Sequence, residues 1–583
     1  MSQLNSNYTA TSTESFSELY NTSINNPSEF WQKQAERIYW HKPPQQILDD
    51  SKLPFAQWFV GGETNLCYNC IDRHLETRAE QDAFIWVSSE INQELIDNHP
   101  GVVPAFKALD NDVEFYTDYA KRRLTYNRLY KEVNYFSDVL QRMGVGKGDR
   151  VIIYMPMILE AAYAMLACTR IGAIHSVVFG GFAAHNLAIR MSDAEAKVVI
   201  TVDAGLRGGK VINYKNLVNQ GVEEASVKPE HVLVVNRGIM PYEPTAIDVD
   251  YATERRISCD ARAVVEPEWL ESNTPSYLLY TSGTTGTPKG VQRDTGGYAV
   301  ALTTSMDYIY DAKPGETFWA ISDIGWAVGH SYTIYAPLLS GLTSIMYEGL
   351  PHSPNPGIWW RIVEANKVNI LFTAPTGVRM LKKQDETWLT RYDTSSVKSF
   401  FLAGEPLDEP TGKWLSGHLG VPIIDHYWQT ETGWPILSHA PKFNYKDHKP
   451  GTPGYPMFGY DAKVLNEETG EPCQPGEKGL LAISAPLPPG CLTTVWKNNE
   501  RFIKSYYSLF DGQQYSSSDY AVTDEEGYFY ILGRTDDVIN VAGHRIGTQE
   551  IEAAISEHPE VAEVGVVGIK DELKGELPIA FCI

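Results

Sequence analysis

A loop of glycine and hydroxyl residues follows a strand-like apolar segment near the middle of the chain. It reads Tyr280-Thr281-Ser282-Gly283-Thr284-Thr285-Gly286-Thr287-Pro288-Lys289-Gly290. Glycines let the backbone approach a ligand closely, hydroxyl and backbone N–H groups donate to phosphate oxygens, and Lys289 adds a positive charge. The loop is not a Walker loop, because Lys289 is followed by glycine and the glycine spacing differs. It predicts a phosphate-binding loop of another type; the alternative is a flexible linker.

Two further polar segments follow apolar strand-like runs. Gly404-Glu405-Pro406 comes after residues 400–403, and Asp425-His426-Tyr427-Trp428-Gln429-Thr430-Glu431 comes after residues 421–424. Ligands of parallel sheets bind at the carboxyl ends of strands, so we expect both turns to meet in one cleft. A carboxylate such as Glu431 suits Mg²⁺. For the aromatic pair in the second segment, core packing is the alternative.

A third cluster combines cations with glycines. Arg207-Gly208-Gly209-Lys210 places two positive charges around a flexible turn, and Phe179-Gly180-Gly181 ends a predicted strand. Guanidinium and ammonium groups in this arrangement suit the phosphates of an anionic ligand. An ordinary charged surface loop is the alternative.

The elements that must position these residues alternate between strand and helix. Strands are predicted at 151–155, 173–179, 198–202, 231–235, 276–280 and 368–372, with helices at 158–172, 183–197 and 359–366. Repeated βαβ units predict an α/β fold with a mostly parallel sheet. A stretch rich in proline and glycine, residues 449–459, marks a change to β-rich sequence.

Domain boundaries follow from composition. Residues 1–30 are rich in Ser, Thr and Asn and predict a loose N-terminal arm, with order beginning near Phe30 and Trp31. The charged turn Arg534-Thr535-Asp536-Asp537 precedes a new βα unit. We therefore expect one large domain over 31–535 and the start of a small, incomplete one over 536–583, which is short for an independent core.

Composition excludes several classes of function. The 583 residues carry a net charge of −24, which argues against a general affinity for nucleic acid or anionic membranes. Seven cysteines argue against a secreted disulfide scaffold, and the pair Cys67 and Cys70 lacks a second pair for a zinc site. The first basic residue is Lys33, which argues against a signal peptide or a transit peptide. Pro156 and Glu160 interrupt the longest apolar stretch, which argues against a membrane-spanning segment. A cytoplasmic protein with packing cysteines is expected.

The phosphate loop resembles the signature of the adenylate-forming superfamily, which includes acyl-CoA synthetases, luciferases and peptide-synthetase adenylation domains. The resemblance covers most of the chain. Trp58-Phe59-Val60-Gly61-Gly62, Asn65-Leu66-Cys67 and Asp72-Arg73-His74-Leu75 look like the N-terminal region of short-chain acyl-CoA synthetases, especially those that activate propionate. The resemblance implies a large domain of packed βαβ subdomains with a β-rich subdomain, followed by a small mobile α+β domain.

The resemblance also implies roles for individual residues. The ATP-binding residues would be Thr281, Ser282, Gly283, Thr284, Thr285, Gly286, Thr287, Lys289, Gly404, Glu405, Pro406, Asp425, His426, Tyr427, Trp428, Gln429, Thr430, Asp519, Arg534 and Arg545. Asp519 corresponds to a ribose-binding aspartate, although this chain has Ser517-Ser518 where the family usually has Thr-Gly. Lys289 and Glu431 would act in catalysis, with Glu431 on Mg²⁺, and Asp536 would be the hinge between domains.

Coenzyme A is the second ligand that the resemblance implies. Its binding residues would be Gly180, Gly181, Arg207, Gly208, Gly209, Lys210, Val328, Ala542 and Gly543. The carbonyls of Ser556, His558 and Val561 correspond to positions that hold a structural cation in relatives.

The acyl pocket would be formed by Ala327, Val328, Ala403 and Trp428. Trp428 matches a tryptophan that blocks the acyl tunnel in short-chain members, and the two alanines stand where acetate-specific relatives carry valine. Removing valine methyl groups leaves room for one more methylene, so propionate is expected to be preferred over acetate. The alternative is that both alanines are ordinary core residues.

These observations predict ATP-dependent ligation of a short carboxylate to coenzyme A through an acyl-adenylate. The partners expected are small molecules, with no nucleic acid and no membrane. Alternatives are an acetate–CoA ligase, an amino-acid-activating adenylation domain, or a nucleotide-binding relative without full activity. After Arg545 the lysines are Lys570 and Lys574, and neither lies in the family's Pro/Thr/Gly-Lys motif. We therefore expect a shortened chain with impaired adenylation that still forms thioester from preformed adenylate.

Overall fold

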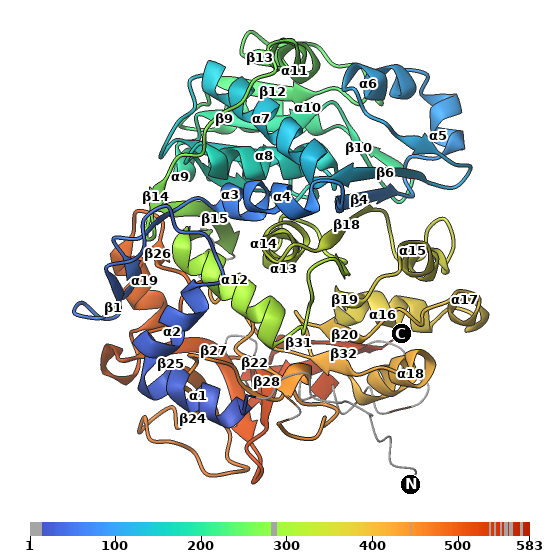
Figure 1. The fold of residues 1–583 in the computed structure, drawn as a ribbon. Helices are drawn as coiled ribbons and strands as arrows, with labels where there is room; N and C mark the ends of the chain where they lie inside the picture. Colours follow the sequence, from blue (N-terminus) through green and yellow to red (C-terminus); the bar gives the residue numbers. More distant parts are fainter. Residues whose placement is uncertain are drawn as a thin grey trace.

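The computed structural model describes residues 14–281, 288–443, 445–535, 538–541, 544–548, 551–552, 555, 558, 564–571 and 575–582. Two eight-stranded sheets and a four-stranded sheet form the larger part of the molecule, and helices cover the two larger sheets (Figure 1). The predicted α/β class is confirmed.

The first large sheet contains the predicted βαβ units. Its strand order is β13 (Asp248–Asp250), β12 (His231–Val235), β9 (Val198–Val202), β7 (Arg150–Tyr154), β8 (Ile174–Val177), β15 (Pro275–Thr281), β16 (Lys289–Asp294) and β26 (Thr494–Val495). The strands from β13 to β15 are parallel, and β16 and β26 are antiparallel. Helices α8 (Leu159–Arg170) and α9 (Ala184–Ala194) lie within a few residues of their predicted bounds.

The second large sheet combines strands that are distant in sequence. Its order is β21 (Ile423–Asp425), β20 (Ser399–Leu402), β19 (Ile370–Thr373), β17 (Thr317–Ala320), β18 (Thr343–Glu348), β4 (Asp82–Ser88), β6 (Ala120–Thr125) and β5 (Glu114–Phe115). Strand β4 pairs in parallel with β18, with Ile85 opposite Ile345. A segment from the start of the chain therefore completes a sheet made mainly of residues 317–425.

A buried ion pair joins the two large sheets. Arg237 lies just after β12, and Glu348 lies at the end of β18. Both terminal nitrogens of Arg237 donate hydrogen bonds to the Glu348 carboxylate, at 2.8 and 2.9 Å. Both side chains are almost fully buried. This two-point contact fixes the distance between the ends of the two strands.

The change to β-rich sequence after residues 449–459 is confirmed. Strands β24 (Ala462–Leu465), β25 (Gly479–Ser484), β27 (Gln514–Thr523) and β28 (Phe529–Arg534) form an antiparallel sheet. Further along, β29 (Val538–Val541), β30 (His544–Gly547), β31 (Val564–Asp571) and β32 (Gly575–Cys582) form a separate sheet.

The loose arm predicted over residues 1–30 is wrong for its second half. Helices α1 (Phe16–Asn25) and α2 (Pro27–Ala35) are formed there, and residues 1–13 lie outside the described part. The Ser15 side chain accepts the N–H of Glu18 and caps α1. Phe16 is buried, with its ring 4.6 Å from that of Tyr445 and 5.0 Å from that of Phe458. Burial of this ring stabilises a helix in which most of the other residues are polar.

The two early cysteines pack in the core, as predicted. Cys67 and Cys70 are fully buried in α3 (Leu66–Cys70), and burial raises the pKa of the Cys67 thiol to about 12. Such thiols remain protonated and unreactive. Among the residues that the structure describes, no helix is both long and apolar enough to span a bilayer.

Candidate active site

The turns after β20 and β21 meet in one cavity of about 180 Å³. Its lining consists of Gly404, Glu405, Pro406, Leu407, Asp425, His426, Tyr427, Trp428, Gly451, Pro453, Asp519, Ile531, Gly533 and Arg534. The two strands are parallel neighbours, so their carboxyl ends lie at the same edge of the sheet. The sequence predicted this convergence, and the β-rich sheet supplies the facing wall.

Asp519 is the centre of a hydrogen-bond network in this cavity. Its Oδ2 accepts hydrogen bonds from the Tyr427 hydroxyl and, at 2.7 Å, from Gln429 Nε2. The Tyr515 hydroxyl donates to Gln429 Oε1 at 2.8 Å. Burial and the Asp519 carboxylate together raise the pKa of Tyr427 well above its usual value. Tyr427 therefore stays a donor, and Arg534 lies directly opposite Asp519 on the paired strand.

His426 and Glu405 line the cavity but bind protein groups with their side chains. His426 Nδ1–H donates to the Leu402 carbonyl at 2.6 Å, and its Nε2 accepts from the Tyr310 hydroxyl at 2.9 Å. Burial lowers the pKa of His426 to about 4, so the ring is neutral. The Glu405 carboxylate accepts from Arg379 Nη1 at 2.6 Å. These two side chains fix the turns that line the cavity.

Among the residues that line the cavity, Asp425 has a carboxyl whose pKa lies near neutral pH. Burial raises the pKa of its carboxyl to about 7. The Leu407 N–H donates to its Oδ2 at 3.2 Å, which partly offsets the effect of burial.

The two ends of the predicted phosphate loop lie side by side. Thr281 at the end of β15 is paired with Lys289 at the start of β16, and residues 282–287 lie outside the described part of the chain. The Lys289 ammonium is 4.5 Å from the ring centre of Tyr506, at the end of α19 (Asn499–Tyr506). The Tyr506 hydroxyl donates to Glu431 Oε1 at 2.6 Å, and the Thr281 hydroxyl is 3.4 Å from the same oxygen. The structure therefore brings together Thr281, Lys289 and Glu431.

Arg293 binds the backbone of the turn that carries Glu431. This fully buried guanidinium donates to the Glu431 carbonyl at 2.8 Å and also to the Thr430 carbonyl. A Cβ at Gly433, where φ is +75°, would lie 2.9 Å from Arg293 Cζ, so glycine is required there. Neither Arg293 nor Tyr506 belongs to a recognisable motif, and sequence analysis missed both.

One of the predicted acyl residues, Trp428, belongs to a group of packed aromatic rings. Trp428 packs edge-on against Tyr332, with ring centres 5.6 Å apart, and its ring is tilted relative to that of Phe372 at 6.4 Å. Buried Ala403 donates its N–H to the Thr373 carbonyl, next to Phe372. Ala327 and Val328 form α13 (Ala327–Gly329), which continues into η2 (His330–Tyr335) and so leads to Tyr332.

The predicted cation cluster is a β-hairpin. Strands β10 (Gly205–Arg207) and β11 (Lys210–Ile212) are joined by Gly208 and Gly209, with φ of +60° and +75°. The Arg207 guanidinium lies 5.0 Å from the ring centre of Phe179. The N–H groups of both turn glycines donate to the carboxylate of Glu90, at 2.8 and 3.0 Å. Because the turn amides are already bound, the two cations are the groups left for a ligand.

Close packing explains the two glycines, Gly180 and Gly181, in the turn that follows Phe179. A Cβ at Gly180 would lie 2.0 Å from the Tyr214 hydroxyl oxygen, so no larger residue fits there. A Cβ at Gly181 would lie 2.5 Å from Cε1 of the Phe179 ring.

Several predicted residues receive no structural account. Asp536, Ala542, Gly543, Ser556 and Val561 lie outside the described residues. Arg545 belongs to β30, and the His558 N–H donates to the Ile555 carbonyl at 3.1 Å. In the part of the chain that is described, no three His, Cys, Asp or Glu side chains are grouped to hold a metal ion.

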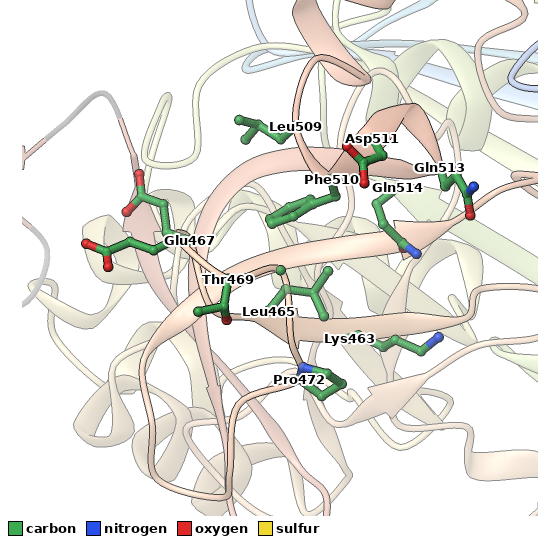
Figure 2. Close-up of a pocket in the computed structure, with 12 residues that line it drawn as sticks. Lys463, Leu465, Glu467, Thr469, Pro472, Leu509, Phe510, Asp511, Gln513 and Gln514 are labelled. Atoms are coloured by element: carbon green, nitrogen blue, oxygen red, sulfur yellow. The ribbon is translucent and has the colours of Figure 1, made fainter.

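A larger cavity, of about 520 Å³, lies on the β-rich sheet (Figure 2). Phe510, Gln514 and Leu465 are among its lining residues, with Glu467 and Thr469 on the adjoining loop. None of the predicted site residues lines it, so volume alone does not identify the active site here.

Comparison with known proteins identifies three family models that match this chain. A family model described as "AMP-binding enzyme" matches residues 105–489, "Acetyl-coenzyme A synthetase N-terminus" matches 16–70, and "AMP-binding enzyme C-terminal domain" matches 550–583. The propionate–CoA ligase of Salmonella typhimurium is 52% identical over 570 residues, which are 98% of this chain and 86% of that protein.

Two other relatives are more distant. The acetyl-coenzyme A synthetase of Pyrobaculum aerophilum is 41% identical over 98% of this chain and 82% of its own. The human mitochondrial acyl-CoA synthetase short-chain family member 3 is 40% identical over 96% of this chain and 78% of its own. These similarities show that the chain belongs to the AMP-binding enzyme family, among the short-chain acyl-CoA synthetases.

Proposed function

We propose that this chain joins propionate to coenzyme A through a propionyl-adenylate, releasing AMP and pyrophosphate. The observation that carries the proposal is the cavity in which Asp519, Arg534 and Tyr427 meet next to Trp428. A nucleotide bound there would have its α-phosphate near the acyl pocket. The printed name of the 52% identical relatives favours propionate.

In the first step a carboxylate oxygen attacks the α-phosphorus of ATP, and the bond to pyrophosphate breaks. Positioning and charge stabilisation supply most of the catalysis in such a step. Asp519 accepts hydrogen bonds from ribose hydroxyls, and Lys289 and Arg534 bring positive charge to the phosphates. The Glu431 carboxylate and Thr281 hydroxyl are hard oxygen ligands that would hold Mg²⁺, and the ion would supply positive charge to the leaving pyrophosphate.

In the second step the thiol of coenzyme A attacks the acyl carbonyl carbon, and AMP leaves. Arg207 and Lys210 pair with the phosphates of coenzyme A, and the neighbouring turn at Gly180 and Gly181, which packs against Tyr214 and Phe179, would line the site. Asp536 is the hinge for the movement that exchanges the two half-reactions.

The preference for propionate is assigned to the small side chains at Ala327 and Ala403. Burying one more methylene contributes about 0.8 kcal/mol, and a pocket discriminates by roughly 1–3 kcal/mol per methylene. Propionate should therefore be preferred over acetate by about tenfold to a few hundredfold. We also propose a cytoplasmic location, since all seven cysteines are free thiols.

The test measures pyrophosphate release and thioester formation separately, with acetate, propionate and butyrate. We expect kcat/KM to be highest for propionate, and the rate of pyrophosphate release tests the expectation that the adenylation step is impaired. An acetate–CoA ligase is the second candidate, supported by the 41% identical acetyl-coenzyme A synthetases, and a higher kcat/KM for acetate would select it. Nucleotide binding without acid-dependent release of pyrophosphate, and without thioester formation from supplied propionyl-adenylate, would contradict both.

A further inference from the structure

Glu90 makes an unusual contact with the cation hairpin. It lies two residues beyond the end of β4 and is only 6% exposed. Its Oε1 accepts the N–H of Gly208 at 2.8 Å and its Oε2 accepts the N–H of Gly209 at 3.0 Å. Each carboxylate oxygen therefore holds one amide of the turn.

From this contact we propose that Glu90 is a positioning residue for the binding of coenzyme A. By holding the turn between Arg207 and Lys210, Glu90 sets the position of these two cations. The inference rests on the proposed function, because it assigns Glu90 a part in binding the thiol substrate. It adds to the site a residue from a different sheet.

The geometry of the turn explains why one carboxylate is enough. Gly208 and Gly209 both have left-handed φ angles, +60° and +75°, so their N–H groups converge on one side. Such convergent amides form an anion-binding concavity, which the Glu90 carboxylate fills. Two charge-assisted hydrogen bonds then fix the turn relative to β4, in the second large sheet.

The hairpin has few other means of fixing its cations. Arg207, Gly208, Gly209 and Lys210 are all exposed, and β10 and β11 form a sheet of two strands only. Long exposed cationic side chains lose conformational freedom when they bind a ligand. Fixing the backbone that carries them lowers this loss for each phosphate contact.

The position of the hairpin also affects the acyl end of the site. Arg207 lies over the ring of Phe179, and that ring is 5.3 Å from the ring of Trp326. Trp326 directly precedes Ala327, a predicted residue of the acyl pocket. A turn fixed by Glu90 therefore holds the cations at a constant distance from the place where the thioester forms.

The experiment compares coenzyme A with pantetheine, which lacks the nucleotide and its phosphates. The Glu90→Gln variant of the full chain is supplied with preformed propionyl-adenylate, and kcat/KM is measured for each thiol. We expect about a tenfold loss for coenzyme A, the effect of losing a charge-assisted hydrogen bond. Pantetheine, and pyrophosphate release from ATP and propionate, should change less than twofold.

Glu271 provides a matched control. Its carboxylate also accepts two backbone N–H groups, those of Gly61 at 3.1 Å and Asn273 at 2.8 Å, in a region without predicted site residues. Glu271→Gln should leave the ratio of coenzyme A to pantetheine activity unchanged. In a chain that also carries Arg207→Met and Lys210→Met, Glu90→Gln should cause no further loss, because it acts through these cations.

The outcomes separate this inference from the proposed function. If the unsubstituted chain shows no preference for coenzyme A over pantetheine, the assignment of the coenzyme A site is wrong. If that preference exists but Glu90→Gln keeps it, or strengthens it because the carboxylate competes with phosphate, the role of Glu90 is overturned. Should Glu90→Gln fail to fold, Glu90→Asp gives the same comparison with a shorter carboxylate.

Discussion

The proposed nucleotide site and the proposed coenzyme A site are built differently. In the proposed nucleotide cavity, Tyr427 and Gln429 both donate to Asp519, which is buried, and they are themselves half-buried. On the coenzyme A side, Arg207 and Lys210 are exposed, and Glu90 fixes only the turn between them. In the proposed sites, the nucleotide would therefore be bound by preformed directional hydrogen bonds, and the thiol substrate by surface charge on a fixed turn. Substitution of a single polar residue should therefore weaken nucleotide binding more than coenzyme A binding. A higher salt concentration should weaken coenzyme A binding more than nucleotide binding.

The largest effect should follow Asp519→Asn. Tyr427 and Gln429 both donate to Oδ2 of the native carboxylate, and the amide oxygen of asparagine can still accept from them. The negative charge is lost, and an NH2 donor replaces the other oxygen, which is proposed to accept from the ribose, so kcat/KM for ATP should fall about 100-fold. Initial rates at varied ATP measure this, with Tyr520→Phe as control, because the Tyr520 hydroxyl faces Glu467 at the other cavity. An unchanged KM for ATP would remove Asp519 from the nucleotide site.

A smaller but more specific effect should follow Ala327→Val combined with Ala403→Val. Added methyl groups would occupy the space assigned to the propionate methylene, next to Trp428. The ratio of kcat/KM for propionate to that for acetate should fall by about tenfold or more. The KM for coenzyme A should not move, which separates the acyl pocket from the cation hairpin. If the acid ratio stays constant, the pocket lies elsewhere.

Salt should distinguish the two sides by a few-fold. Exposed charges are screened within about 8 Å at physiological ionic strength, whereas enclosed groups are screened much less. Raising the salt concentration should therefore increase the KM for coenzyme A by roughly threefold more than the KM for ATP. Steady-state titrations in low and high salt test this. An equal response of both substrates would contradict the difference drawn between the two sides.

The smallest effect concerns pH and Asp425. Its pKa rises from 3.8 in the unfolded chain to about 7 in the folded protein. The folded state therefore binds more protons between these values, and its stability should fall as pH rises from about 4 to about 7. Asp425→Asn should remove this contribution, which thermal melting at several pH values measures as a few degrees. Identical pH profiles for the two proteins would show that Asp425 titrates normally.

Residues that lie in motifs could be predicted from the sequence, and residues that support them could not. The turns at Gly404 and Asp425 were predicted to share a cleft because both follow apolar strands of a parallel sheet. Glu90, by contrast, contacts a turn 118 positions away, and Arg293 contacts a carbonyl 138 positions away. No local pattern marks a carboxylate or guanidinium that acts on distant backbone groups.

The N-terminal helices show a second limit of pattern analysis. Residues 16–25 contain mostly polar side chains, and this composition predicted a loose arm. The helix depends instead on Phe16, whose ring is buried among aromatic residues near position 450. Tertiary burial of one ring here outweighs composition.

The pairing of β4 with β18 has a consequence for how the chain folds during synthesis. Strand β4 leaves the ribosome early, yet its parallel partner follows only after residue 342, so closing this contact requires a very long loop. Until then β4 can pair only with β6 in an antiparallel ribbon, which leaves its other edge open. A nascent chain of this protein therefore carries an unpaired apolar strand through much of translation, which is the kind of surface that chaperones protect.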